Sequence, residues 1–233
     1  MPRLLVVLLC ACCLALAACG DDKETAGGGA EAPTATTESQ PPAETTDAAP
    51  GCEAADKPKT KKVGKRKRPS LKLDRGKDYT AVLATSCGSI EIKLDVKRAP
   101  KTAASFVALA RAKFFDGLGF HRIVPGFVVQ GGDPAGNGSG GPGYDVVETP
   151  PDTLKYTKGI VAMAKTEMDA PGTSGSQFFI VTAPDAGLPP EYALLGKVTK
   201  GMDAVTKIEA VPAEPDGQPT EPVVIEKITI RER

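Results

Sequence analysis

Residues 120–134, with the sequence FHRIVPGFVVQGGDP, place polar side chains inside a strand-like apolar stretch. His121, Arg122 and Gln130 lie within a few residues of Phe127 and its aliphatic neighbours. If these side chains meet across a groove, a permanently charged guanidinium stands beside an apolar pocket. Such an arrangement supplies a fixed hydrogen-bond donor for chemistry that needs no titrating base. If they face water instead, the stretch is an ordinary half-buried hairpin.

Proton-transfer and metal chemistry fit the rest of the sequence poorly. His121 is the single histidine, so a hydrolase triad would have to use it, and no GxSxG motif is present. The histidine count also excludes Cys–His metal sites, and residues 136–143 lack the Gly-Lys-Ser/Thr ending of a phosphate loop. We therefore expect His121 to be a hydrogen-bonded strand residue. Rotation about an X–Pro bond is a reaction that needs neither a base nor a metal. Its barrier of about 18–20 kcal/mol comes from amide resonance, and a hydrogen-bond donor to the imide nitrogen weakens that resonance.

The first 19 residues, MPRLLVVLLCACCLALAAC, predict export. The apolar run from Leu4 to Ala18 is shorter than the roughly 20 residues of a membrane span and suits a signal peptide. Leu16-Ala17-Ala18-Cys19 resembles a bacterial lipobox, which implies that residues 1–18 are a lipoprotein signal peptide and that Cys19 is lipidated. The acylated chain would then be anchored to the cell membrane on its extracytoplasmic side. The alternatives are an ordinary signal peptide cleaved elsewhere and an uncleaved anchor.

Two cysteines, Cys52 and Cys87, remain in the mature body of the chain. An exported protein meets an oxidising compartment, which favours a Cys52–Cys87 disulfide between the end of the linker and the first pair of strands. Two independent thiols are the alternative.

Two linker segments precede the globular part. Residues 19–56 predict a disordered tether, because their Gly, Ala, Pro, Thr and acidic residues cannot bury enough apolar surface. Residues 57–70 form a basic linker, which we expect to be solvated and extended. Contact of residues 57–68 with anionic lipid or cell-wall polymers is the alternative. The formal net charge of +0 argues neither for nor against nucleic acid, and we expect no nucleic-acid partner.

Residues 71–233 have the composition of a folded domain. Their many short strands and two separate helices favour an antiparallel barrel or sandwich. The expected strands are two within 79–95, one on each side of Pro125-Gly126, and one each at 159–165, 176–182, 193–199 and 222–232. The expected helices are 101–113 and 201–211.

Three motifs together resemble cyclophilin-type peptidyl-prolyl isomerases. They are FHR…PGF…QGGD (120–133), SGSQFFI (174–180) and LLGKVTKGMDAV (194–205), in the order found in that family. The resemblance covers about residues 77 to 232. It implies a mainly-β domain, a closed eight-stranded antiparallel barrel capped by two α-helices, with the active groove on its outer face. It also implies an isomerase that needs no cofactor and no metal.

The resemblance assigns roles to matching positions. Arg122 would be the catalytic arginine, directed at the prolyl nitrogen, and Phe127 and Phe179 would form the floor and wall of the proline pocket. Gln130 would hydrogen-bond the substrate backbone, while Gln177 would support Arg122 or the adjacent groove. The other expected substrate-binding positions are Val128, Leu188, Tyr192, Gly138, and the strand edge formed by Ala164, Lys165 and Thr166.

The strand geometry around these residues gives two more expectations. The two-residue period of a strand predicts that Phe120 and Arg122 share one face. The stretch Gly131-Gly132-Asp133 is expected to be a turn, with the aspartate as a local hydrogen-bond anchor.

Four positions depart from the pattern common among relatives. Val128 replaces Met, Lys165 replaces Asn, Tyr192 replaces His, and Gly187 replaces Trp. Because the missing Trp removes contact surface, we expect weaker binding of cyclosporin A than in Trp-bearing members.

The expected function is isomerisation of X–Pro bonds in exported proteins. The expected partners are proline-containing polypeptides, and the chain is expected to be a monomer. A non-catalytic chaperone or scaffold that binds proline peptides is the alternative.

Overall fold

The computed structural model describes residues 51–61, 64 and 66–233. The expected signal peptide, Cys19 and most of the expected tether lie outside these residues. Within the part of the chain that is described, no helix has both the length and the apolar character needed to cross a membrane.

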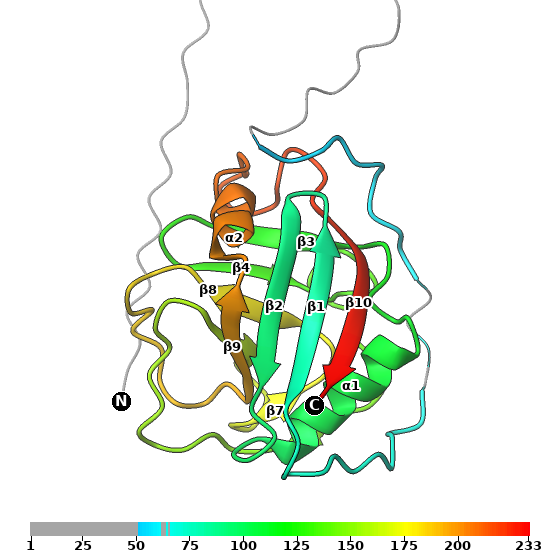
Figure 1. Ribbon diagram of the computed structural model, residues 1–233. Coiled ribbons are helices and arrows are strands. Elements are labelled where there is room, and N and C mark those ends of the chain that lie inside the picture. Colours follow the sequence, from blue (N-terminus) through cyan, green and yellow to red (C-terminus); the bar gives the residue numbers. More distant parts are fainter. Residues whose placement is uncertain (1–50, 62–63, 65) are drawn as a thin grey trace, which may run out of the picture. The chain divides into compact units, whose positions relative to one another are not determined.

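Eight strands close into an antiparallel barrel (Figure 1). In order around the barrel they are β1 (Tyr79–Thr85), β10 (Val224–Glu232), β3 (Leu118–Val124), β4 (Val128–Gly131), β8 (Phe178–Val181), β6 (Ile160–Met163), β9 (Leu194–Lys200) and β2 (Gly88–Leu94). The predicted closed barrel is therefore confirmed. Two further strands, β5 (Val146–Val147) and β7 (Thr173–Ser174), form a separate two-stranded sheet that the sequence pattern did not predict.

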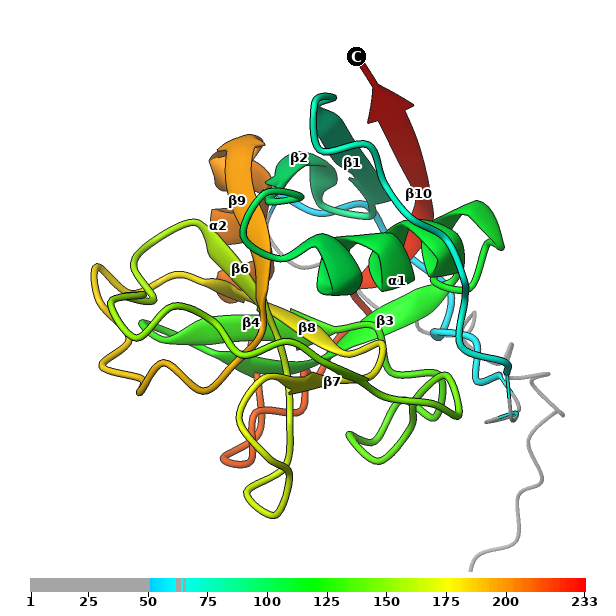
Figure 2. The same cartoon turned by 90° about the horizontal axis from the view of Figure 1, so that it is seen from below.

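Two helices lie at opposite ends of the barrel (Figure 1). Helix α1 (Pro100–Arg111) begins with a proline, whose fixed φ suits the first helical turn. It buries Phe106 and Leu109, and Figure 2 shows it beside β10. Helix α2 (Met202–Glu209) buries Val205 and Ile208 against the other end. Both predicted helices are present, with ends shifted by a few residues.

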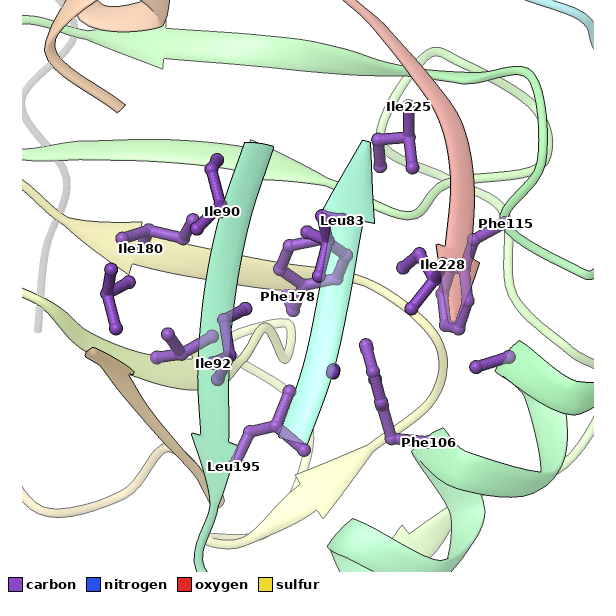
Figure 3. Packing of buried hydrophobic residues seen from close by; sticks show 14 of the residues in the cluster. Leu83, Ile90, Ile92, Phe106, Phe115, Phe178, Ile180, Leu195, Ile225 and Ile228 are labelled. Carbon is purple, nitrogen blue, oxygen red and sulfur yellow. The ribbon is translucent and has the colours of Figure 1, made fainter. Parts of the chain in front are cut away.

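The barrel interior is filled with side chains (Figure 3). Phe106 stacks on Phe115 with ring centroids 4.8 Å apart, and the edge of Phe178 packs against both rings. Aliphatic residues complete this core: Leu83, Ile90, Ile92, Ile180, Leu195, Ile225 and Ile228. Because the inside is a packed core, a ligand site has to lie on the outer surface of the barrel.

Strand β8 is buried on both of its faces. Phe178 and Ile180 belong to the core inside the barrel, whereas Phe179 and Val181 belong to a second apolar cluster. Since alternate side chains of a strand point to opposite faces, that second cluster lies on the outside of the barrel wall. The wall of β4, β8 and β6 therefore has a hydrophobic surface on its outer side.

The segment before β1 is attached to the barrel. Cys52 and Cys87 form a disulfide at the turn between β1 and β2. We call the described residues 57–61, 64 and 66–68 the basic strap. Backbone N–H groups of Lys59 and Lys61 donate to the carbonyl oxygens of Gly117 and Pro134, both at 2.8 Å. The charge pattern predicted a solvated, extended segment. The described strap side chains are indeed mostly exposed, but the backbone is docked.

Candidate active site

A β-bulge in β3 decides which way Arg122 points. Phe120 pairs with Gly131 and Arg122 pairs with Gln130, so His121 is an extra residue between the two pairs. An extra residue reverses the alternation of faces. Phe120 therefore enters the core, where it is 1% exposed, while Arg122 lines a pocket outside the barrel. The expectation that Phe120 and Arg122 share a face was wrong for this reason.

The pocket at Arg122 has a volume of about 200 Å³, and we call it the smaller pocket. Strands β3, β4 and β8, the residues just before β4 and just after β6, and the loop after β8 all contribute to it. Its charged lining residues are Arg122 and Lys165, and the rest are mainly apolar or aromatic. The lining consists of Arg122, Phe127, Val128, Gln130, Ala164, Lys165, Phe179, Leu188 and Tyr192, all of them positions expected from the sequence. The structure thus brings nine predicted residues together from four separate segments.

The aromatic wall of the smaller pocket rests on a buried tyrosine. The rings of Phe179 and Tyr192 meet edge to face, with centroids 5.5 Å apart. Tyr156 lies behind both rings and is 0% exposed. Its hydroxyl donates to the Tyr192 carbonyl oxygen at 2.6 Å and accepts from the Tyr192 N–H at 3.0 Å. Burial raises the pKa of Tyr156 to about 12, so the hydroxyl keeps its proton and locks the backbone of Tyr192.

A larger pocket of about 410 Å³ adjoins the smaller one. Gln130, Ala164 and Lys165 line both, so the two pockets form one groove. The three remaining expected positions, Gly138, Thr166 and Gln177, line the larger pocket. An extended peptide could therefore place one residue in the smaller pocket and a neighbouring residue in the larger.

Two glutamines connect the halves of the groove. The Nε2 of Gln130 donates to the Oε1 of Gln177 at 2.9 Å. The Nε2 of Gln177 in turn donates to the carbonyl oxygens of Gly138 and Gly140, at 2.8 and 2.9 Å. Gln177 thus supports the adjacent groove, which was one of the two roles expected for it, and its hydrogen bonds are to Gln130 and the loop.

Asp133 is a local anchor, as expected. Its side chain is buried, and its carboxylate accepts hydrogen bonds from the backbone N–H groups of Ala135, Asn137 and Gly138, at 2.8, 2.9 and 2.6 Å. All of its close partners are backbone donors of the following loop. The carboxylate therefore organises the loop beside the larger pocket.

Lys165 folds over the junction of the two pockets. Its side chain is 5% exposed, and its ammonium lies 3.3 Å from a carboxylate oxygen of Glu191 and 5.5 Å from the centre of the Tyr192 ring. It also donates to the carbonyl oxygens of Thr166 and Asp169. The sequence drew attention to the backbone of residue 165, whereas the structure shows that the side chain also shapes the groove.

His121 is a strand residue, as expected, but the expected hydrogen bond is missing. Neither of its ring nitrogens has a hydrogen-bond partner among the residues that the structure describes. Burial lowers its pKa, and the nearby charge of Asp133 only partly opposes this. The side chain lies outside the lining of both groove pockets and borders a separate pocket beneath the strap.

The geometry combines a permanent cation with an apolar slot. A guanidinium carries a permanent positive charge, and aromatic side chains line the smaller pocket together with Arg122. A comparison with known proteins identifies the arrangement: a family model described as "Cyclophilin type peptidyl-prolyl cis-trans isomerase/CLD" matches residues 80–230. This chain belongs to the cyclophilin family. It is a peptidyl-prolyl cis-trans isomerase of the cyclophilin type.

Individual cyclophilins support the assignment over the whole barrel. Peptidyl-prolyl cis-trans isomerase B of Streptomyces anulatus is 39% identical over 172 residues, which cover 66% of this chain and 97% of the relative. Peptidyl-prolyl cis-trans isomerase A of Mycobacterium tuberculosis is 39% identical over 169 residues, covering 65% and 91%. A crystal structure of a Cryptosporidium parvum cyclophilin in the presence of the dipeptide Ala-Pro has a TM-score of 0.61 and 31% identity, covering 65% of this chain and 98% of that one.

Sequence reasoning missed several parts of this cyclophilin groove. Tyr156 carried no motif; its only signal was a large aromatic residue in an otherwise polar stretch. Glu191 and Asp169, which hold Lys165, gave no pattern because they lie in loops. Their roles depend on contacts between loops that come together only in the folded chain. The alternation of residues along strands gives no information about such contacts.

Proposed function

We propose that this cyclophilin isomerises X–Pro bonds in exported polypeptides, and that lipidated Cys19 anchors it on the extracytoplasmic face of the cell membrane. The isomerase chemistry belongs to the family, whereas export and anchoring are our proposal. They are supported by the signal-like residues 1–18 with the lipobox, and by the Cys52–Cys87 disulfide, a bond typical of oxidising compartments. Uncatalysed X–Pro isomerisation takes about tens to hundreds of seconds and can limit folding.

Arg122 in the smaller pocket is the observation that carries the mechanism. The X–Pro bond resists rotation because the nitrogen lone pair is delocalised into the carbonyl group. A guanidinium N–H donated to the prolyl nitrogen holds that lone pair on nitrogen and so weakens the partial double bond. Phe127 and Phe179 hold the proline ring while the bond turns. No proton is transferred at any step, so the reaction requires no general base.

The rest of the groove positions the peptide on either side of the proline. Gln130 is placed to hydrogen-bond the substrate backbone, since it lines both pockets. Residues 164–166 continue beyond the end of β6 and form the edge along which the peptide extends. The related structure determined with Ala-Pro supports a proline-containing peptide as the ligand of this groove.

A protease-coupled assay on a short proline peptide tests the mechanism. Arg122→Ala should lower kcat/KM by about 10²–10³, the usual loss when a donor to the transition state is removed. Arg111→Ala is the matched control, because Arg111 lies on α1 and pairs with Glu232 at the surface. Equal catalysed rates for the wild type and Arg122→Ala would refute the role of Arg122. Rates no faster than the uncatalysed reaction in both would leave a non-catalytic proline-peptide binder, which is the alternative function.

The anchoring proposal needs a separate experiment. In cells expressing the full chain, Cys19→Ala should move the protein from the membrane fraction to the soluble extracytoplasmic fraction and abolish incorporation of labelled fatty acid. The wild type and Cys52→Ser serve as controls, because both keep the lipidation site. Unchanged membrane association and labelling in Cys19→Ala would refute lipidation at this residue.

A further inference from the structure

We propose that the basic strap is a positioning element for the peptide groove and that it acts by holding both ends of the glycine-rich wall, which we define as residues 134–145. The inference rests on the proposed function, because it concerns how the groove binds peptides longer than the proline dipeptide. It assigns Lys61 and Arg66 to the groove, although neither lines it.

Apart from its hydrogen bonds to the Asp133 carboxylate, the glycine-rich wall has few large side chains to hold its position. Its sequence, PAGNGSGGPGYD, contains five glycines, and Gly136, Gly138 and Gly143 have positive φ angles. Glycine loses more conformational freedom on folding than any other residue. The wall lines most of one side of the larger pocket, so its position depends on contacts from outside.

The strap supplies such contacts at both ends of the wall. The backbone N–H of Lys61 donates to the carbonyl oxygen of Pro134 at 2.8 Å. The backbone N–H of Arg66 donates to the carbonyl oxygen of Pro142 at 3.1 Å. The strap therefore bridges the start of the wall and a point close to its end.

The strap is itself firmly attached to the barrel. Pro58 lies against Gly119, where an added Cβ would come within 2.7 Å of the proline ring. The ammonium of Lys61 donates to the carbonyl oxygens of Lys113 and Phe114, at 3.1 and 2.6 Å, just beyond α1. The guanidinium of Arg66 lies 5.2 Å from the centre of the Phe114 ring, within the range of a cation–π contact.

Two further contacts fix the beginning of this attachment. The Cys52–Cys87 disulfide ties the chain to the β1–β2 turn, and the backbone N–H of Glu53 donates to the carbonyl oxygen of Ser86 at 2.7 Å. A strap fixed at this end cannot move away from the wall without breaking several contacts. The disulfide therefore restricts the wall from a distance.

Gln177 links the wall to the centre of the groove. That side chain donates to the carbonyl oxygens of Gly138 and Gly140 in the wall and accepts from Gln130. If the wall shifts, the orientation of the two glutamines shifts with it. No residue that lines the smaller pocket forms a hydrogen bond or ion pair with the described residues of the strap or of the wall, and Gln130 is linked to the wall only through Gln177. Loosening the strap should therefore weaken binding of extended peptides while leaving the proline chemistry intact.

The test compares two peptides with the same central X–Pro bond, a tetrapeptide and an octapeptide, on the full chain. Arg66→Ala removes the contact with Phe114, and Cys52→Ser removes the covalent tie. Lys67→Ala is the matched control, because the exposed Lys67 side chain forms no hydrogen bond or ion pair with the described residues. Hydrogen exchange at the amides of residues 137–141 reports on the wall independently of turnover.

We expect KM for the octapeptide to rise about threefold in Arg66→Ala, which corresponds to the loss of one cation–π contact. In Cys52→Ser this KM should rise at least as much. We expect kcat, and kcat/KM for the tetrapeptide, to stay within about twofold, and the wall amides to exchange faster. Lys67→Ala should match the wild type. The proposal would be overturned if KM for the octapeptide and hydrogen exchange at the wall amides were unchanged in both variants. It would also be overturned by an equal loss of kcat/KM for both peptides, because that result indicates general loosening of the domain. If the wild type turned over neither peptide, the proposed function would fail, while hydrogen exchange would still decide the role of the strap.

Discussion

Replacement of Tyr156 by phenylalanine removes a single oxygen atom from behind the smaller pocket. That hydroxyl satisfies both the carbonyl and the N–H of Tyr192, at 2.6 and 3.0 Å. The side chain is 0% exposed, so water cannot easily replace it. Tyr156→Phe therefore leaves two backbone groups without their partner at the wall of the proline site.

The expected cost follows from these two bonds. A hydrogen bond contributes about 0.5–1.5 kcal/mol net, and a buried group left unpaired costs about 1–3 kcal/mol. Because Tyr192 is only partly buried, we expect a loss of about 2 kcal/mol in the free energy of unfolding, or a Tm lower by about 4–8 °C. Since Tyr192 packs against Phe179, kcat/KM should also fall, by about twofold to fivefold. Urea unfolding and the protease-coupled assay measure the two effects.

The high pKa of Tyr156 adds a dependence on pH. Burial raises its pKa from the ordinary 10.0 to about 12 in the folded state. Between these values the unfolded chain loses the proton while the folded chain keeps it, so stability falls as pH rises. The contribution is fully present below pH 10 and is lost towards pH 12, to the extent of roughly 2–3 kcal/mol. The stability advantage of the wild type over Tyr156→Phe should shrink across this window.

Tyr79→Phe is the control for this reasoning. The Tyr79 hydroxyl accepts from Asp74 at 3.2 Å and donates to Glu232 at 3.4 Å, and both partners are exposed residues. Its loss should therefore cost less than about 1 kcal/mol. A Tyr156→Phe protein that is as stable as Tyr79→Phe, with unchanged kcat/KM, would refute the view that the buried hydroxyl supports the pocket.

Three further predictions concern other parts of the molecule. Burial lowers the pKa of His121 below its ordinary 6.5, so the contribution of the neutral His121 side chain to stability is full above pH 6.5 and is lost as pH falls below that value. In urea unfolding, the free energy of unfolding of His121→Asn should therefore fall less steeply with decreasing pH than that of the wild type. An identical dependence on pH would contradict this. Because the disulfide joins residues 35 positions apart, Cys52→Ser should cost about 2–4 kcal/mol in the free energy of unfolding, and a loss below about 1 kcal/mol would contradict this. Cyclosporin A should bind more weakly than to Trp-bearing cyclophilins, because Gly187 presents no side chain at an exposed position; equal affinity in a titration would show that this reasoning is wrong.

Local patterns predicted the strands and helices and favoured an antiparallel barrel or sandwich, whereas the resemblance to cyclophilins predicted the closed barrel and the groove residues. Alternating strands, two periodic helices and the motif around Arg122 were all readable in short windows of residues. Nine of the expected positions line one pocket in the structure, although they come from segments far apart in the chain. Here the family motifs supplied the long-range information that periodicity lacks.

The failures of prediction have physical causes. The bulge at His121 places Phe120 and Arg122 on opposite sides of the wall, and a single inserted residue leaves the composition of a strand unchanged. Tyr156 matters because of where its hydroxyl lies, which no local pattern encodes. The docking of the basic strap was missed because its charge predicted solvation, whereas its backbone hydrogen bonds depend only on a matching surface.

The wall formed by β4, β8 and β6 separates two environments that can change independently. Phe178 and Ile180 face the packed core, while Phe179 lines the groove and Val181 belongs to the same outer apolar cluster. Over evolutionary time, the groove side can therefore accept substitutions that alter peptide choice while the residues that hold the barrel closed stay the same. The departures Val128, Lys165 and Tyr192 lie on the groove side. The peptides that the groove binds can thus change while the barrel keeps its stability.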